Sequence, residues 1–353
     1  MSAIQREDRI IWLDKLRVTA CLMVIALHVA DLFFTVGEPV GSYRWNTGNV
    51  ISSLTRCAIP LFVMISGSLF LDPRKEIGLK TLYGRYILRI ATAFIFWSGL
   101  YAALQYSQGI RVRTVVRDFV TGGVHLWFLY MIVGMYIVTP LLRKIANSKN
   151  TRVYFLALWI ATTVLYNTLR AFFSILSPRV TPWLDTAAAE SDLYLAYGYT
   201  GFFVLGWYLR EKELTKTVRR VIYALGILGA AFTVAATHFF SKRNGILDNT
   251  FYNNMTVGIT LQAVALFVFF KYNVKNAKSG RTAKAFAKAS SCVFGTYLVH
   301  QLFVNNFDRL FGFGLNSFDP ILSFLAVFCI VTVCSAAVSY VFNLIPGVKK
   351  YLV

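Results

Sequence analysis

The chemistry of the sequence begins in its first hydrophobic segment, WLDKLRVTACLMVIALHVADLFF, residues 12–34. Arg17 and His28 are eleven residues apart. In an α-helix this spacing amounts to three turns plus about 20°, with a rise of about 16 Å, so the two side chains point the same way at different depths. Asp14 and Asp31 fall within about 100° of the same face. Because charged groups at membrane depth are costly, we expect this polar stripe to face the protein interior.

His28 and Asp31 are the pair best suited to proton transfer. A neutral imidazole can act as a general base, and Asp31, one turn further on, can orient His28 or hold its proton. The alternative is a core histidine whose ring nitrogens are satisfied by hydrogen bonds. Arg17, in turn, is either a functional cation or an anchor that extends to the cytoplasmic surface from the helix end.

The second hydrophobic segment, VISSLTRCAIPLFVMISGSLFL, carries an arginine well inside it. Since this segment runs in the opposite direction, Arg56 is expected at about the depth of His28. It either forms an ion pair, with Asp31 as the candidate partner, or binds a ligand, and the two roles are compatible. The small residues 66–68 favour close approach of a neighbouring helix.

The third hydrophobic segment begins with two arginines. Arg85 and Arg89 are four residues apart and therefore share one face of a helix. They are expected at about the depth of Arg17. Two interpretations are open, namely anchors at the membrane surface or a clamp for phosphate groups, whose oxygens match the geometry of guanidinium.

Further candidates lie toward the opposite side of the membrane. His125 and Trp127 open the fourth hydrophobic segment, and Tyr297 and His300 are three residues apart in the ninth. Taken alone, Trp127 is typical of an interfacial aromatic, and a single membrane histidine is usually structural. Three histidines on separate helices near an arginine indicate a cavity. The predicted substrate-binding residues are Arg56, His125, Trp127, Tyr297 and His300.

The composition indicates that membrane helices position these residues. The 353-residue chain is 57% hydrophobic and 16% aromatic, with a mean hydropathy of +0.57. Its apolar runs are close to the length of about 20 residues that crosses a hydrocarbon core, whereas barrel strands would alternate in shorter segments. We predict an all-α polytopic membrane protein with one transmembrane domain over residues 1–353 and no appended soluble domain. The ten predicted spans are 11–35, 48–71, 84–106, 124–143, 153–176, 193–210, 219–240, 254–272, 287–311 and 320–343.

Membrane topology explains most of the net charge of +20. The predicted cytoplasmic segments hold 24 Lys and Arg residues, against 9 on the outer side. By the positive-inside rule, both termini are then cytoplasmic and the number of spans is even. Nucleic acid is not needed as a partner, and the basic loops can contact anionic membrane lipid.

The remaining sequence features point to no metal or disulfide chemistry. All five cysteines lie in apolar runs without metal-ligand spacing, so we interpret them as small buried hydrophobic residues. The first hydrophobic stretch lacks a small-residue cleavage pattern and is expected to be a retained helix rather than a signal peptide.

The candidates form two layers, cationic near the cytoplasm and capable of proton chemistry further out. This arrangement suits a ligand with an anionic head in the cytosol and a reactive end in the membrane, which is the shape of an acyl-CoA. It also suits a proton-coupled transporter or exporter of a glycan intermediate, with His28 and Asp31 as a proton relay. Many transporters contain inverted repeats, yet the Arg/His pattern does not recur later in this chain.

Four motifs occur in order between residues 12 and 303, namely WLDKLRVTACLMVIALH, IPLFVMISGSLFL, HLWFLYMIVGMYIVTPLL and FGTYLVHQLF. With them the sequence resembles acyltransferase family 3, membrane proteins of about ten helices. The resemblance implies transfer of an acyl group, usually acetyl from acetyl-CoA, to a hydroxyl of a cell-surface polysaccharide or its lipid-linked precursor. It also implies a multi-pass protein of the bacterial inner membrane.

The resemblance assigns roles to individual residues. It implies that His28 is catalytic and Arg17 essential. Asp31, from its position one turn after His28, would set the tautomer of the imidazole. Arg85 and Arg89 match the family's paired arginines, although three residues separate them where the family usually has two. Acetyl-CoA would be a co-substrate held by Arg17 and this pair, and no metal is expected. Some members of the family carry a soluble esterase-like domain, and we expect none in this chain.

Overall fold

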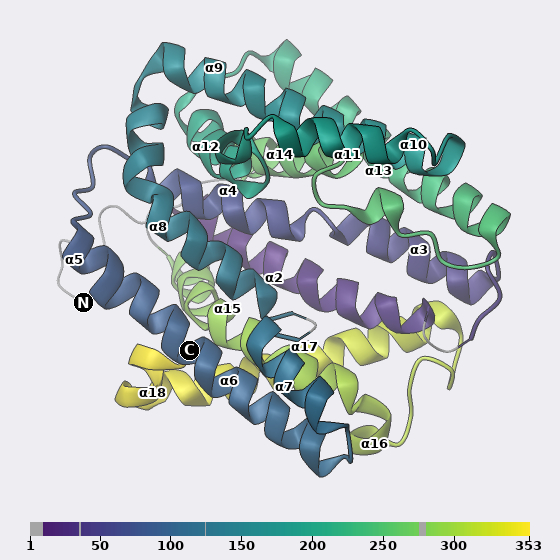
Figure 1. Ribbon diagram of the computed structural model, residues 1–353. Helices are drawn as coiled ribbons and strands as arrows, with labels where there is room; N and C mark the ends of the chain where they lie inside the picture. Colours follow the sequence, from purple (N-terminus) through teal and green to yellow (C-terminus); the bar gives the residue numbers. More distant parts are fainter. Residues whose placement is uncertain (1–9, 35–36, 124, 275–279) are drawn as a thin grey trace.

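A computed structural model of the protein describes residues 10–34, 37–123, 125–274 and 280–353, and all regular elements within these ranges are helices (Figure 1). The predicted all-α polytopic fold is confirmed, because eight described helical segments are long and apolar enough to cross a membrane. Residues 1–9 and 275–279, which belong to predicted cytoplasmic segments, lie outside the described residues. The eight segments are Ile11–Phe34, Tyr43–Phe70, Leu79–Ser107, Trp127–Asn147, Lys149–Leu176, Lys216–Asn244, Thr250–Asn273 and Pro320–Leu344.

Two of the ten predicted spans are not among these eight segments. The span predicted over 193–210 overlaps α12 (Tyr199–Glu211), whose 13 residues extend only about 20 Å. The span predicted over 287–311 lies largely in α15 (Arg281–Asn305), which is 25 residues long. The part of α15 inside the predicted span holds polar residues, among them Lys288, His300 and Gln301, and α15 is not among the candidate hydrophobic spans. The number of crossings, ten, therefore stays a prediction.

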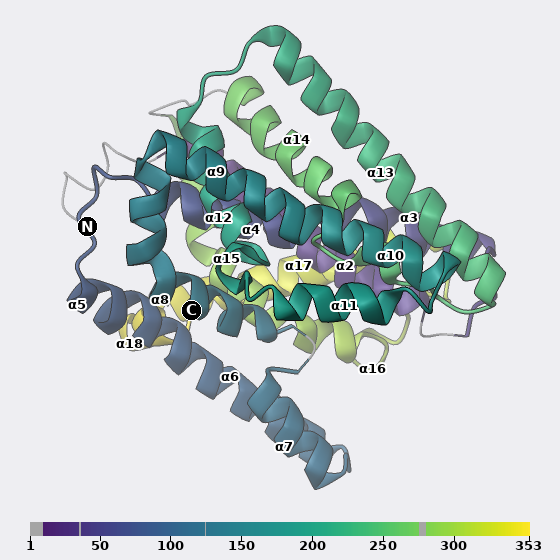
Figure 2. The same cartoon turned by 45° about the horizontal axis from the view of Figure 1, so that its top comes forward.

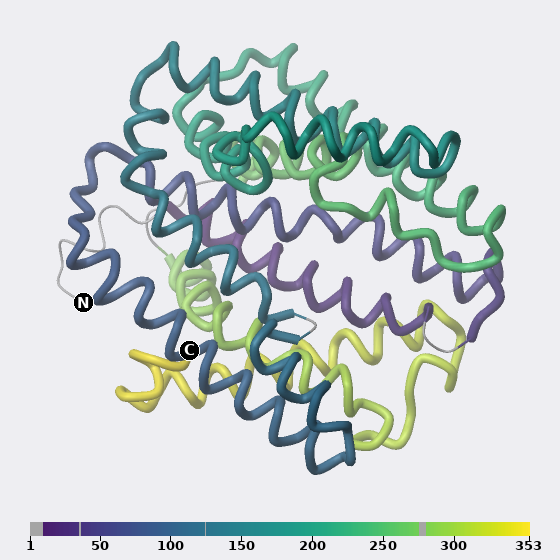
Figure 3. Tube along the Cα trace, viewed as in Figure 1, coloured from purple at the N-terminus to yellow at the C-terminus, as the bar shows by residue number. Residues whose placement is uncertain are grey.

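Helix α2 (Ile11–Asp31) runs through the middle of the molecule (Figures 1 and 3). It packs against α3 (Tyr43–Thr55) and α4 (Ala58–Phe70) on one side and against α15 and α17 (Pro320–Leu344) on the other. A helix that is apolar almost all round is buried by its neighbours. Completely buried residues of α2 include Leu16, Ala20, Val29 and Ala30.

Two further groups of helices flank this centre (Figures 1 and 2). The first group lies on the side of α4 and comprises α8 (Trp127–Asn147), α9 (Lys149–Trp159), α10 (Tyr166–Leu176), α11 (Thr181–Glu190), α12, α13 (Lys216–Asn244) and α14 (Val257–Asn273). The second group lies beside α15 and α17 and comprises α6 (Leu88–Ser107), α7 (Val112–Thr121) and α18 (Pro346–Tyr351). Figure 2 shows α6 and α7 extending away from the body of the protein.

The predicted second span is interrupted in its middle. Helix α3 ends at Thr55 and α4 begins at Ala58, with a turn at Arg56 and Cys57. Pro60 has no backbone N–H, so the helical hydrogen bond to the carbonyl of Arg56, four residues earlier, cannot form. The break therefore follows from the sequence, and it places Arg56 at a junction between two helix ends.

Helices α4 and α12 cross in very close contact. A Cβ atom added to Gly67 would lie 1.8 Å from the backbone oxygen of Phe203, and one added to Gly206 would lie 2.0 Å from that of Met64. These separations leave no room for a side chain. They confirm the prediction that the small residues around position 67 allow close helix approach.

The loop after α4 contains a buried carboxylate with arginine partners. Asp72 is 1% exposed, and its Oδ2 lies 2.7 Å from Nη2 of Arg74 and 3.2 Å from Nη2 of Arg210. Burial raises the pKa of Asp72, but the hydrogen bonds from Arg74 and the charge of Arg210 outweigh this effect and leave the pKa below its ordinary value. A lowered carboxyl pKa stabilises the fold above the unfolded pKa of about 3.9, and this contribution is lost as the pH falls through the folded pKa.

We therefore expect Asp72→Asn to lower the unfolding free energy at pH 7 by about 1–3 kcal/mol, because two arginines lose a charged acceptor. The difference from wild type should shrink as the pH falls below about 4. Thermal unfolding in detergent across this pH range measures both effects. Glu190→Gln, at an exposed acid of α11, is the control and should leave the transition unchanged. Equal transitions of Asp72→Asn and wild type at pH 7 would contradict the prediction.

Candidate active site

Three histidines from separate parts of the chain meet near the middle of the bundle. His28 comes from α2, His125 from the turn before α8, and His300 from α15. The ring centroid of His300 lies 5.2 Å from that of His28 and 5.2 Å from that of His125, while His28 and His125 are 6.5 Å apart. The sequence placed all three in the outer half of the membrane, and the structure brings them together. We call these three residues the histidine cluster.

A hydrogen bond fixes the ring of His300 within the cluster. Nδ1 of His300 lies 2.6 Å from the backbone carbonyl of Tyr297, and since a carbonyl only accepts, Nδ1 must carry the proton. Nε2 of a neutral His300 is then an acceptor, and it is buried without a partner among the described residues. Nε2 of His125 is buried in the same way. The Tyr297 hydroxyl donates to the backbone carbonyl of His125.

Asp31 forms the predicted ion pair with Arg56. Arg56 Nη2 lies 2.9 Å from Asp31 Oδ1, which also accepts a hydrogen bond of 3.0 Å from the hydroxyl of Ser52. The Arg56 guanidinium lies 4.4 Å from the ring centroid of Tyr252, and its Nε is buried without a described partner. The described hydrogen bonds of Asp31 thus go to α3 and the junction after it, and none reaches His28, which Asp31 was expected to orient.

A cavity of about 550 Å³ lies next to the cluster. It is on the side of the protein that the distribution of Lys and Arg predicts to face the cytoplasm. Arg17, Lys75, Arg89 and Lys349 line it, and no carboxylate is among its lining residues. At its inner end the cavity reaches Tyr297, whose ring centroid lies 5.8 Å from that of His300. This space, which we call the inner cavity, therefore combines a cationic entrance with an end beside the cluster.

Arg17 is positioned by a polar contact between α2 and α15. The hydroxyl of Ser290 donates to Asp14 Oδ1 at 2.7 Å and accepts from Arg17 Nη1 at 3.2 Å. Arg17 also lies 3.6 Å from Asp14. Asp14 is buried, so its contact with Ser290 fixes the register of the two helices. The sequence carries no signal that links Ser290 to Arg17, which are 273 positions apart.

The two arginines of the third hydrophobic segment have different surroundings, although the sequence placed them on one helix face. Arg89 lines the inner cavity, and its guanidinium donates to the backbone oxygen of Val353. Arg85 is exposed, near the ring of Tyr86, and does not line this cavity. The reason is local, because residues Leu82–Ile87 form a π-helix. A π-turn contains an extra residue and rotates the positions before it relative to those after it.

The two predicted aromatic residues have different surroundings. Tyr297 lines the inner cavity and contacts the cluster. Trp127 packs edge to face against Phe128 and tilted against Tyr199, with centroid distances of 6.4 and 6.2 Å. Trp127 is not among the lining residues of the described cavities, which agrees better with its interpretation as an interfacial aromatic.

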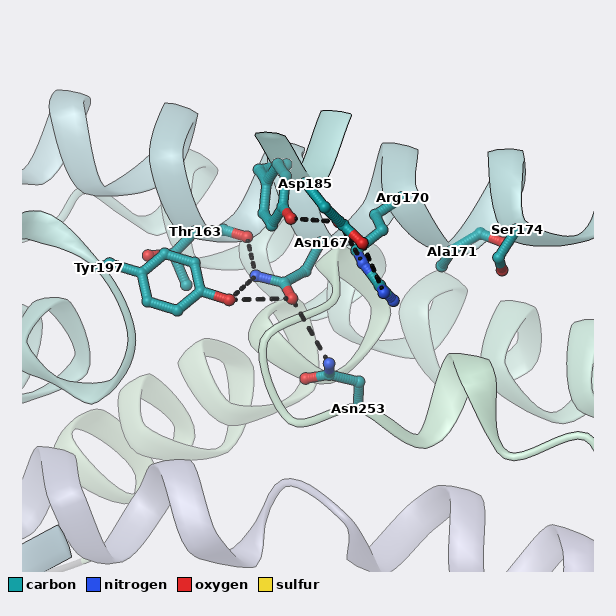
Figure 4. A network of polar contacts seen from close by, with 9 residues as sticks. Thr163, Asn167, Arg170, Ala171, Ser174, Asp185, Tyr197 and Asn253 are labelled. Atoms are coloured by element: carbon teal, nitrogen blue, oxygen red, sulfur yellow. Dashed lines mark hydrogen bonds and ion pairs between the residues drawn. The ribbon is translucent and has the colours of Figure 1, made fainter. Parts of the chain in front are cut away.

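A second large cavity, of about 810 Å³, lies on the opposite side of the cluster. It is bounded by the outer end of α2, the α3–α4 junction, α10 and the loop before α14. Asp31 and Arg56 line it, together with Asn167 and Arg170 of α10. It shares no lining residue with the inner cavity. We call it the outer cavity, and Figure 4 shows the polar network on its α10 side.

Comparison with known proteins identifies the family to which the chain belongs. Residues 10–340 match the model of the acyltransferase domain family, so the chain belongs to this family of membrane acyltransferases. It is also 29% identical over 363 aligned positions to a serine/alanine racemase of Enterococcus gallinarum, an alignment that covers 82% of this chain and 50% of the racemase. The chain thus spans about half the length of that relative. No solved structure matches the chain.

Proposed function

We propose that the protein is an inner-membrane O-acetyltransferase that moves an acetyl group from acetyl-CoA to a hydroxyl of a cell-surface polysaccharide or its lipid-linked precursor. The observation that carries this proposal is the pair of cavities, one cationic and one polar, on opposite sides of the histidine cluster. Membership in the acyltransferase family supports acyl transfer. It disfavours the alternative of a proton-coupled transporter.

The inner cavity suits the donor. Four cationic side chains and no carboxylate line it, which is the charge expected around the phosphates of a coenzyme A. The lining changes from these charges to aromatic and aliphatic residues such as Phe62, Phe128 and Leu129. An acetyl-CoA bound with its phosphates at Arg17 and Arg89 would direct its thioester toward the histidine cluster.

His28 is the proposed general base. It takes the proton of the acceptor hydroxyl while the hydroxyl oxygen attacks the thioester carbonyl carbon. When the tetrahedral intermediate collapses, the C–S bond breaks and the thiolate of coenzyme A leaves and takes up the proton. Arg56 can stabilise the oxyanion through Nε, which has no described partner. In the other route His28 accepts the acetyl group first and passes it to the hydroxyl.

For the acceptor, the resemblance of WLDKLR, ACLMVIALH, TRCAIPLFVMISG and HLWF extends to the O-acetyltransferase of the enterobacterial common antigen. We therefore propose a surface glycan of this kind. The test is the O-acetyl content of surface polysaccharide, measured by NMR, in cells with and without the protein. Identical acetyl signals in the two strains would refute the proposal.

A donor-site prediction follows from the position of Arg89. We expect Arg89→Gln to raise the KM for acetyl-CoA about tenfold or more, because a charge-assisted contact to phosphate is lost, with a smaller change in kcat. Initial rates of CoA release by the purified protein give both constants. Arg220→Gln, at an exposed arginine of α13, is the matched control and should have a wild-type KM. An unchanged KM for Arg89→Gln would remove this residue from the donor site.

A further inference from the structure

We propose that the outer cavity is the binding site of the acceptor carbohydrate, and that its amide side chains on α10 and on the loop before α14 select that carbohydrate. This inference rests on the proposed function and specifies where its second substrate binds. Of the five substrate-binding residues predicted from the sequence, which include Trp127 and Tyr297, Arg56 alone lines the outer cavity.

The size and position of the outer cavity fit a second substrate. Its volume of about 810 Å³ falls within the range of about 300–1,000 Å³ typical of small-molecule sites. Asp31 lines it, and Asp31 is one helical turn beyond His28. A ligand in this cavity therefore lies on the other side of the histidine cluster from the inner cavity.

The lining of the outer cavity matches a sugar better than an anion. Both of its arginines are already paired with carboxylates, Arg56 with Asp31 at 2.9 Å and Arg170 with Asp185 at 2.7 Å. Because each of these arginines has a carboxylate partner, the outer cavity offers its ligand no excess of positive charge. Its other polar groups are amides and hydroxyls, which both donate and accept hydrogen bonds as sugar hydroxyls do. The ring of Tyr252, which packs against the Arg56 guanidinium, also lines the cavity.

The amide groups are held in place by a network (Figure 4). The Asn167 amide donates to the carbonyl of Thr163 at 2.7 Å, and the Asn253 amide donates to Asn167 Oδ1 at 3.4 Å. Asn253 Oδ1 accepts from the backbone of Met255 at 2.9 Å. The network joins α10 to the loop before α14, so these side chains are oriented before a ligand binds. Asn249 of the same loop also lines the cavity and is exposed.

Asn249 offers a way to block the cavity without disturbing the network. We expect Asn249→Trp to lower O-acetylation of surface polysaccharide at least about tenfold, because the indole fills space the acceptor needs. The Kd of the Asn249→Trp variant for acetyl-CoA, measured by calorimetry on the purified protein, should equal that of wild type. Asn244→Trp, near the end of α13 and outside the cavity lining, is the matched control and should keep full O-acetylation.

A chemical version of the experiment avoids any effect on folding. Cells producing Asn249→Cys are treated with a membrane-impermeant methanethiosulfonate, and incorporation of labelled acetate into polysaccharide esters is then followed. We expect modification to stop incorporation and a thiol reductant to restore it, while Asn244→Cys and wild type are unaffected.

The outcomes separate the two proposals. Wild-type O-acetylation by Asn249→Trp, or full activity of modified Asn249→Cys, would overturn the assignment of the outer cavity and leave the proposed function standing. Failure of the wild-type protein itself to bind acetyl-CoA and to acetylate polysaccharide would refute the proposed function, and this inference with it.

Discussion

Replacing His28 by alanine should lower acetyl transfer about 10²–10⁴-fold, the range over which a positioned general base contributes to rate. The loss is expected in kcat, whereas the Kd for acetyl-CoA should change little, because the cationic lining of the inner cavity is intact. Surface-glycan O-acetylation measured by NMR, together with CoA release by the purified protein, gives the result.

The matched control for this variant is His238→Ala. His238 is a partly buried histidine of α13 whose Nδ1 lies 2.8 Å from Asn46 Oδ1, away from the histidine cluster. It should retain wild-type transfer. Full acetylation by His28→Ala at a normal protein level would remove His28 from the reaction. A trapped acetyl adduct on His28, seen by mass spectrometry of the wild-type protein, would select the acyl-carrier route over the general-base route.

The second large effect is expected on stability. Gly67→Ala places a Cβ only 1.8 Å from the backbone oxygen of Phe203, and because the clash is with backbone, α4 and α12 must move apart. Overpacking of this kind costs about 1–3 kcal/mol or more. We expect a clearly lower midpoint of thermal unfolding in detergent and a reduced amount of protein in the membrane.

Gly134→Ala makes the same substitution in a transmembrane helix with no atom within 4 Å of the new Cβ. It should be neutral or slightly stabilising, since alanine favours the helix over glycine by about 0.8–1 kcal/mol. If the two variants unfold at the same temperature, the close crossing of α4 and α12 does not limit stability.

Local periodicity and membrane depth predict a large part of the site. The shared face of Arg17 and His28 follows from helix geometry alone, and the ion pair of Asp31 with Arg56 follows from their matching depths. The sequence also placed His125 and His300 in the outer half of the membrane with His28, but depth alone does not specify that the three converge, since His238 of α13 lies apart from them.

Features that depend on contacts between distant segments could not be predicted from the sequence. The hydrogen bonds of Ser290 with Asp14 and Arg17 join positions more than 270 residues apart, and a serine in a helix gives no sign of its partner. The separation of Arg85 from Arg89 depends on a π-turn, which residue type alone does not specify. Asp31 was expected to orient His28. Instead it forms an ion pair with the charged Arg56 and accepts a hydrogen bond from the hydroxyl of Ser52.

The separation of the inner and outer cavities has an electrical consequence. The two cavities share no lining residue. In the proposed arrangement, with one cavity open to the cytoplasm and the other to the opposite side, the insulating layer between the two compartments would be thinnest at the histidine cluster. The membrane voltage then falls mainly across these few side chains instead of across the whole bilayer. A charge moved through the cluster exchanges about 2.3 kcal/mol with the field for each 100 mV. In the proposed reaction, proton movement at His28 would therefore be coupled to the energised state of the membrane.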